Sequence, residues 1–203
     1  KKLLIVILII FVVLIAAIAV VPFIFKDKIV AKVKTAINDN VNAKVNFGTF
    51  DLSLLSSFPN LTLCLNDLSV IGINEFTGDT LTYMKELDVK LDLMSAIKGE
   101  TIQIKSINLN HALINLLVRK DGKVNWDISK PTPPSASSAS SGYHIELSSY
   151  SLNESEIRYD DQSLGMKIIL QDVNHSGSGD FTQDLFTLST KTQIAKTNIG
   201  MVL

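Results

Sequence analysis

The side chains able to perform acid–base or metal chemistry are few in this chain and lie far apart. Histidine occurs at His111, His144 and His175, a spacing unlike that of metal ligands within one motif. We expect all three histidines to face solvent, with His175, in Asn174-His175-Ser176, in a turn. Asp160 and Asp161 are adjacent carboxylates, but neighbouring residues of a strand point to opposite faces, so a turn is favoured over an acid–base pair or a calcium site.

Cysteine and charge usage narrow the chemistry further. Cys64 is the single cysteine, which excludes an internal disulfide and a zinc site of several thiolates, and its apolar setting predicts packing. The chain carries 19 basic and 20 acidic residues, so it lacks the basic excess typical of nucleic-acid binding. No nucleophile elbow, phosphate loop or His-Glu-x-x-His motif occurs. We therefore expect no enzymatic activity, catalytic residue, cofactor or metal, and an enzyme is the least favoured hypothesis.

Binding through an apolar surface is the remaining possibility, and the elements that would build it are strands. From Ala43 onward aliphatic and polar residues alternate with period two, the pattern of a strand with one apolar face. The phase slips after Asn66-Asp67, which predicts a bulge, and slips again before Ile107. The candidate surface consists of the aliphatic members of these stripes: Leu61, Leu63, Leu65, Leu87, Val89, Leu91, Leu93, Ile102, Ile104, Ile107 and Leu109.

The apolar stripes must be shielded from water, and no amphipathic helix long enough to cover them follows residue 42. A second sheet would seal them in a β-sandwich, or one sheet would curl around an apolar interior and leave a trough for acyl chains. The alternation alone favours the sandwich. A sealed sandwich would suit a scaffold that binds another protein, whereas a trough would suit lipid.

The N-terminal region predicts a membrane anchor. Leu3 to Phe25 contains no charged residue and, at about 1.5 Å per residue, is long enough to span a hydrocarbon core about 30 Å thick. We assign residues 1–26 to a transmembrane helix with a cytoplasmic N-terminus, because Lys1 and Lys2 precede it. A cleaved signal peptide is the alternative, since Ala17-Ile18-Ala19 has the small-x-small form, but the apolar run continues past it.

Residues 27–42 follow the anchor as a short amphipathic helix, with apolar residues at three- and four-residue spacing. It would cap the first strands or lie on lipid headgroups, and we favour the cap. Residues 43–129 form a first β segment, 130–142 a flexible Pro/Ser/Ala loop, and 143–203 a continuing β segment. The chain lacks a starting Met and stops within an apolar stretch, so we interpret it as part of a longer protein.

Within the first segment, Asp121-Gly122 between Val118 and Val124 is the strongest hairpin signal. It opens a short motif in which Gly122 supplies turn geometry and Asn125 and Trp126 have structural roles. We expect Trp126 to close the hairpin against the sheet with its indole N–H paired.

Several segments together resemble the N-terminal region of AsmA-like proteins. The residues that carry the resemblance are Phe50–Leu61 (FDLSLLSSFPNL), Leu91–Gly99 (LDLMSAIKG) and Asp121–Ile128 (DGKVNWDI), the last similar to that family's dGxxNWd signature. Tyr159-Asp160-Asp161 and Gly179-Asp180-Phe181 resemble its Bacteroidota-type members. The resemblance runs from the N-terminus to about residue 190.

The resemblance implies a mainly β protein: a transmembrane helix and a short amphipathic helix, followed by an elongated, curved antiparallel β-sheet that forms a groove. It also relates the chain to TamB- and YhdP-like proteins with repeated β-grooves. It implies residence in the bacterial inner membrane with the bulk of the chain in the periplasm. The expected partners are the bilayer, phospholipid transferred through the groove in outer-membrane biogenesis, and other envelope proteins.

Overall fold

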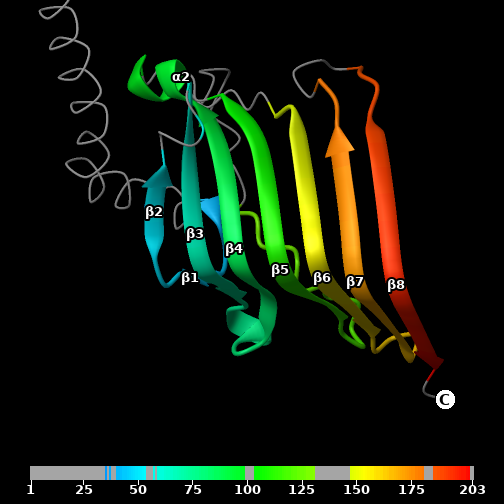
Figure 1. The fold of residues 1–203 in the computed structure, drawn as a ribbon. Helices are drawn as coiled ribbons and strands as arrows, with labels where there is room; N and C mark the ends of the chain where they lie inside the picture. Colours follow the sequence, from blue (N-terminus) through cyan, green and yellow to red (C-terminus); the bar gives the residue numbers. More distant parts are fainter. Residues whose placement is uncertain are drawn as a thin grey trace, which may run out of the picture.

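The computed structural model describes residues 40–53, 59–98, 103–130, 147–180 and 185–201, together with Thr35, Ile37 and Ser57. All eight strands of the described residues belong to one sheet. The strands are β1 (Lys44–Asn46), β2 (Phe50–Ser53), β3 (Asn60–Ile71), β4 (Thr80–Asp92), β5 (Ile104–Val118), β6 (Ser149–Asp161), β7 (Met166–Ser178) and β8 (Ser189–Met201), with a 3₁₀ turn at Asn74–Phe76 and helix α2 (Leu93–Lys98). The order across the sheet is β1-β3-β4-β5-β6-β7-β8, and β2 also pairs with β3. The chain is therefore mainly β, as expected, and its sheet is open and curved (Figure 1).

The β-sandwich alternative is wrong for the described residues, because they contain no second sheet. The prediction of an antiparallel sheet is correct for every strand pair except one. β5 and β6 run parallel, with Ser106 opposite Ser149 and Val118 opposite Asp161. Parallel neighbours require the chain to travel back along the whole of β5 before β6 begins.

The contacts at the two ends of β5 show where this return path starts and finishes. After the Asp121-Gly122 turn, the Asn125 N–H donates to the Leu117 carbonyl at the end of β5, at 3.1 Å. The Ser148 N–H donates to the Lys105 carbonyl at the start of β5, also at 3.1 Å. Lys105 and Leu117 are roughly 40 Å apart along β5 at about 3.3 Å per residue, so a long connection is needed here. The Pro/Ser/Ala stretch of residues 130–142 falls within that connection, although residues 131–146 lie outside the described part of the chain.

Four strands contain a kink, and the local sequences at the four kinks are similar. Asp67, His111, Glu154 and Asp172 have positive φ angles of 52°, 50°, 46° and 51°, a conformation that non-glycine residues seldom adopt. Each is the third residue of a similar tetrapeptide, LNDL at 65–68, LNHA at 109–112, LNES at 152–155 and LQDV at 170–173. The kink reverses the alternation, so that the first and fourth residues of each tetrapeptide point to the same side of the sheet.

The kinks of β3 and β5 lie at one level of the sheet. Asn66 pairs with Glu86 and Glu86 with Asn110, and on the far side of the kink Leu68 pairs with Met84 and Met84 with Ala112. The predicted phase slip after Asn66-Asp67 is thus confirmed, but β3 and β4 do not change register there. Their register shift lies between Val70 and Ile71.

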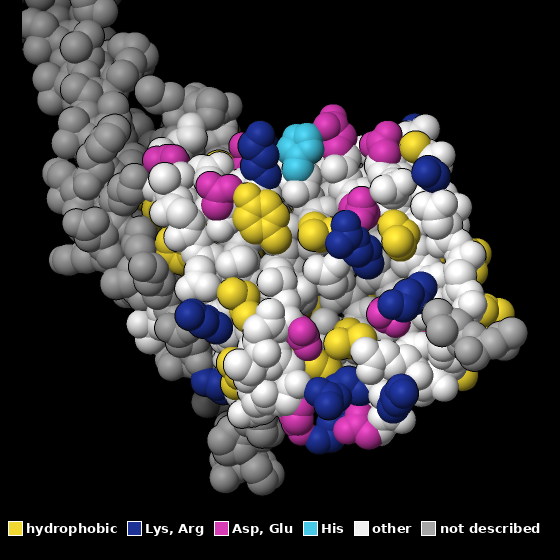
Figure 2. All heavy atoms as spheres, turned by 90° about the horizontal axis from the view of Figure 1, so that it is seen from below, with side chains coloured by type: hydrophobic (Ala, Val, Ile, Leu, Met, Phe, Trp, Pro, Cys, Tyr) yellow, Lys and Arg dark blue, Asp and Glu magenta, His cyan; other side chains and the backbone are white. Residues whose placement is uncertain are grey.

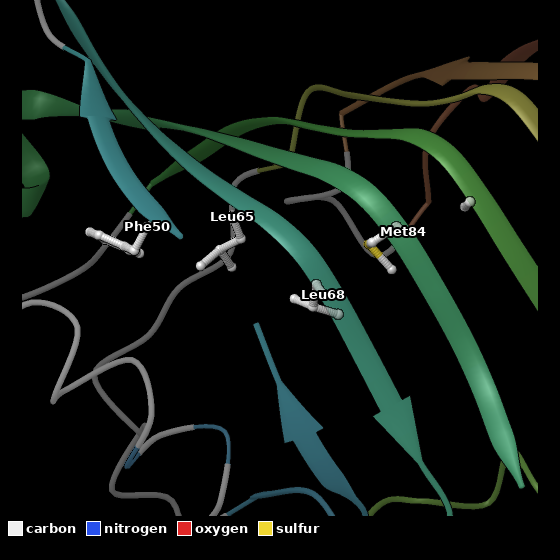
Figure 3. Packing of buried hydrophobic residues seen from close by; sticks show 5 residues of the cluster. Phe50, Leu65, Leu68 and Met84 are labelled. Carbon is white, nitrogen blue, oxygen red and sulfur yellow. The ribbon is translucent and has the colours of Figure 1, made fainter. Parts of the chain in front are cut away.

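The two faces of the bent sheet carry different side chains. Phe50, Leu65, Leu68 and Met84 lie beneath the bend of β3 and β4 and are 4–6% exposed (Figure 3). The opposite face carries basic and acidic side chains among separate hydrophobic ones (Figure 2). We call the face that contains these four residues the inner face, and the opposite face the outer face.

The outer side of the bend is joined by amide side chains. The Asn110 Nδ2 donates to Glu86 Oε1 at 2.7 Å, and the Asn153 Nδ2 donates to Asn110 Oδ1 at 2.8 Å. The Asn66 Nδ2 donates to the Thr49 hydroxyl at 2.9 Å. We call Glu86, Asn110 and Asn153 the outer ladder. It holds β4, β5 and β6 together where the backbone departs from regular strand geometry.

The two edges of the sheet differ. One edge is closed by the short strands β1 and β2, which pair with different halves of β3. The other edge is β8, which has 13 residues, all of them exposed. Long unpaired edge strands invite pairing with a further strand.

The predicted transmembrane helix of residues 1–26 lies outside the described residues. Most of the predicted amphipathic helix of residues 27–42 does too, although Thr35, Ile37 and Asn40 are helical. The Val41 N–H donates to the Ile37 carbonyl at 2.9 Å, and the Lys130 N–H donates to the Asn40 carbonyl at 3.1 Å. None of the helical residues that the structure describes belongs to a helix with the length and hydrophobicity needed to cross a bilayer.

Candidate functional site

The strand register aligns the aliphatic stripes into continuous rows across the inner face. In one row Phe50 pairs with Leu65, Leu65 with Leu87, Leu87 with Leu109, and Leu109 with Leu152. A neighbouring row runs from Leu52 through Leu63 and Val89 to Ile107 and Tyr150. Directly paired residues point to the same side of a sheet, so each row is one strip of apolar surface.

Most of the predicted surface residues meet on this face. Leu61, Leu65 and Leu91 are buried, at 5–9% exposed, whereas the remaining described ones are only half-buried. Leu93 begins α2 and packs with Ile104 against Leu61 and Leu91. Ile102 lies outside the described residues. The half-buried members leave apolar area available to a ligand.

The inner face continues over strands from which no candidate residue was predicted. Ile114 pairs with Ile157 and Ile157 with Leu170, and at the far end Tyr159 pairs with Ile168 and Ile168 with Ile199. The alternation in residues 143–203 indicated these strands. It did not indicate that they join the same face, because that depends on the parallel pairing of β5 with β6.

The two described histidines lie on opposite faces. His111 lies at the kink of β5 with its side chain 51% exposed and its Nδ1 3.4 Å from Glu154 Oε2, which confirms the expected solvent-facing position. The turn expected at His175 is wrong, although the side chain is only half-buried. His175 lies within β7 on the inner face, paired with Leu152, and its Nε2 is 3.2 Å from the Tyr150 hydroxyl. His144 lies outside the described residues.

Asp160 and Asp161 have separate structural tasks, as the alternation predicted. Asp160 pairs with Lys167 on the next strand at 2.9 Å. The buried Asp161 Oδ1 accepts hydrogen bonds from the Ser163 hydroxyl and from the N–H groups of Ser163 and Leu164 at the turn after β6. The Ser163 hydroxyl is the main reason that the pKa of Asp161 is lowered. No group of potential metal ligands occurs among the described residues.

The apolar setting predicted for Cys64 is wrong, because its Sγ lies beside polar groups of the outer face, 3.9 Å from Asn66 Oδ1. Cys64 lies on β3 opposite Asp88, away from the inner face. Burial, followed by the neighbouring Asp88 carboxylate, raises the pKa of the Cys64 thiol to about 12. A thiol with so high a pKa is a poor nucleophile at neutral pH.

The Asp121-Gly122 motif is a tight turn whose anchor is Asn125. Gly122 has φ +81°, and its N–H donates to the Arg119 carbonyl at 2.9 Å. Asn125 is 3% exposed, and its amide accepts from the Leu117 N–H at 2.9 Å and donates to the Asn115 carbonyl at 2.8 Å. Asn125 therefore occupies the backbone groups of β5 beyond the last residue that pairs with β4.

Trp126, expected to close this hairpin, is 39% exposed, and its ring centroid lies 6.4 Å from that of Tyr159. The neighbouring Asn125, rather than Trp126, is thus the residue that anchors the hairpin. Its signal was the amide side chain directly after a short hairpin.

Comparison with known proteins places the chain in a family. The model of the AsmA family matches residues 1–195. The chain belongs to the AsmA family. This family is associated with cell-envelope and outer-membrane biogenesis. No curated protein and no solved structure matches the chain significantly. The inner face described above is thus the candidate binding surface of an AsmA-family sheet.

Proposed function

We propose that this AsmA-family chain binds phospholipid on its inner face and passes it along the sheet in outer-membrane biogenesis. The observation that carries the proposal is the continuity of the aliphatic rows from β2 to β6, without a covering layer in the described residues. Flexible acyl chains need apolar contact area more than directional bonds. An inner face of half-buried Leu, Ile and Val side chains supplies such area.

The distribution of charge supports the same proposal. The ionic side chains of β6 and β7 that form pairs, Glu156 with Arg158 and Asp160 with Lys167, alternate with the inner-face residues and so lie on the outer face. Removing an unpaired charge from water is costly, so a lipid-binding face should lack such groups. On the inner face of strands β3 to β8, as aligned by the register, the only carboxylate is Asp161 in its turn.

The test compares lipid that co-purifies with matched variants of the full chain. The double variant Ile194→Asp, Ile199→Asp places two charges on the inner face of β8, where these side chains are 42% and 69% exposed and the fold should tolerate them. The control is Gln193→Asp, Asn198→Asp, two exposed outer-face positions of the same strand. The three proteins are otherwise identical, including the predicted anchor of residues 1–26. Any difference in lipid content therefore reflects the face that carries the charges.

We expect quantitative mass spectrometry of extracted lipid to give several-fold less phospholipid for the inner-face variant than for wild type and the control. Equal phospholipid in the three folded proteins would refute the proposal.

We also propose that the chain is anchored in the inner membrane by residues 1–26, with its N-terminus cytoplasmic and its sheet in the periplasm. The uncharged run from Leu3 to Phe25 and the preceding lysines support this topology. An alkaline phosphatase fused after Leu203 should be active in intact cells, because that enzyme folds only in an oxidising compartment. Activity confined to a cytoplasmic reporter at the same position would contradict it.

A scaffolding role that recruits another envelope protein is the second candidate, and the edge of β8 favours it. Among the described residues this strand forms an edge of 13 exposed residues, to which a strand of a partner or a further strand of a longer chain could add. The same variants separate the two functions when co-purified protein is measured beside lipid. A scaffold would keep its partner protein when the inner face is charged.

A further inference from the structure

The inner face is not aliphatic throughout, and one polar cluster on it lies on strands β6 to β8. Along one row, Leu109 pairs with Leu152, Leu152 with His175, and His175 with Thr192 of β8. The neighbouring row ends in Tyr150, which pairs with Gly177. Three polar side chains therefore follow directly after two aliphatic rows on the same face.

These three side chains converge from three adjacent strands. The Tyr150 hydroxyl lies 3.2 Å from His175 Nε2, and His175 Nδ1 lies 2.7 Å from the Thr192 hydroxyl. The rings of Tyr150 and His175 have centroids 5.5 Å apart and planes at 37°. We call Tyr150, His175 and Thr192 the polar triad.

Gly177 gives Tyr150 the room to lie against the sheet. A Cβ atom added at Gly177 would come within 2.3 Å of the Tyr150 ring, so the ring lies over the glycine backbone. The strands thus hold the Tyr150 ring beside His175, in a position that does not depend on a bound molecule. Preorganised polar groups of this kind favour a ligand because little order has to be imposed on binding.

Both ring nitrogens of His175 are hydrogen-bonded to the triad hydroxyls, so the imidazole positions these hydroxyls and the hydroxyl groups supply the O–H donors. Donors suit an oxygen-rich, anionic group such as a phosphate, and no carboxylate shares this end of the inner face, since Asp161 lies at the opposite end of β6. The inner-face residues of β8 then change character along the strand. Thr190 and Thr192 are followed by Ile194, Thr197, Ile199 and Met201, each paired with an inner-face residue of β7, so Thr197 is the one polar residue among the last four.

The distance between the polar and apolar ends fits an amphiphile. Thr192 and Ile199 are separated by roughly 23 Å along a strand, at about 3.3 Å per residue. Half of a bilayer's hydrocarbon core measures about 15 Å. A phospholipid with its phosphate at Thr192 would therefore place its acyl chains over Ile194 and Thr197, directed towards Ile199.

We propose that the polar triad is a subsite for the phosphate group of the bound phospholipid and fixes its orientation, with the acyl chains directed along β7 and β8 towards Ile199. This inference rests on the proposed function and adds to it which part of the lipid is recognised, and where.

The test measures two lipids with the same labelled acyl chains, a phosphatidylglycerol and a diacylglycerol that lacks the phosphate, presented in micelles to the full chain. The variants are Thr192→Val, His175→Leu and Tyr150→Phe, the last of which keeps the ring over Gly177 and removes only the hydroxyl. The control is Gln193→Leu, which changes the adjacent outer-face residue of β8. Urea unfolding of each variant verifies that the sheet remains folded.

We expect His175→Leu to weaken phosphatidylglycerol binding about tenfold or more, because the hydroxyls that it positions lose their hydrogen bonds to the charged phosphate, and to leave diacylglycerol binding unchanged. Thr192→Val and Tyr150→Phe should act in the same direction, and Gln193→Leu should change neither lipid. Inorganic phosphate at equal concentration should not displace the lipid, and displacement would overturn the proposal in favour of a free-anion site.

If the wild type binds both lipids and His175→Leu lowers both equally or neither, the phosphate subsite is refuted while lipid binding stands. If the wild type binds neither lipid, the proposed function fails and the subsite fails with it.

Discussion

The outer ladder provides a sharp test of how this sheet is held in its curve. Asn110 is its central residue, because its amide donates to Glu86 on β4 and accepts from Asn153 on β6. It also precedes His111, the kink residue of β5. Asn110→Ala removes both hydrogen bonds at the point where the backbone departs from regular strand geometry.

The expected loss of stability follows from these two bonds. The 2.7 Å bond to the Glu86 carboxylate belongs to a class that contributes about 1.5–3 kcal/mol, and the 2.8 Å amide–amide bond to a class that contributes about 0.5–1.5 kcal/mol. Asn110 is half-buried, so values near the lower limits apply. We expect Asn110→Ala to lower the free energy of unfolding by about 2 kcal/mol.

Asn108 provides the matched control, because it lies two residues earlier on β5 and has one such bond, from the Ser151 hydroxyl at 2.9 Å. Asn108→Ala should cost about 1 kcal/mol. Both variants are unfolded in urea in detergent micelles and followed by far-ultraviolet circular dichroism, with a lowered midpoint at constant slope as the expected result. Equal midpoints for the two variants, or a larger loss for Asn108→Ala, would refute the role assigned to the outer ladder.

Three further predictions concern single groups. The Thr82 hydroxyl is buried without a hydrogen-bond partner, so Thr82→Val should raise the free energy of unfolding by about 1 kcal/mol in the same urea assay; a loss of stability would show that the hydroxyl is satisfied. Because the pKa of Cys64 is raised to about 12, the folded chain should react with iodoacetamide at pH 8 far more slowly than the urea-unfolded chain, and equal rates would contradict the partial burial of this thiol beside Asp88. The pKa of Asp161 is lowered, so its stabilising effect should be present above the ordinary aspartate pKa and be lost as pH falls through the lowered value; Asp161→Asn should flatten the pH dependence of the urea midpoint in that acidic window, and an unchanged profile would exclude this carboxylate as its source.

The alternation of residues was enough to predict strands and the apolar side of each, because period two is a local property of the backbone. The slip after Asn66-Asp67 even located a kink. The alternation could not show that β5 and β6 are parallel, since strand direction depends on the path of a connection without a pattern of its own. Without that pairing, the rows that join Leu109 to Leu152 could not be anticipated.

The choice between a sandwich and an open sheet was also beyond the alternation, because both bury one face of every strand. The family resemblance favoured the groove, and the single sheet agrees with it. His175 was misplaced for a different reason. Its neighbours in Asn-His-Ser are typical of turns, whereas pairing with β6 and β8 keeps the segment extended.

Site-specific photo-crosslinking tests the central claim, lipid on the inner face, most directly. Ile168 and Ile169 are adjacent and both half-buried on β7, but Ile168 pairs with Tyr159 on the inner face and Ile169 with Arg158 on the outer face. A benzophenone amino acid placed at each position in turn would react with whatever lies against that face in the cell envelope. We predict phospholipid adducts by mass spectrometry at position 168 and none at position 169. Adducts of equal yield at both positions, or protein adducts alone at 168, would contradict the account.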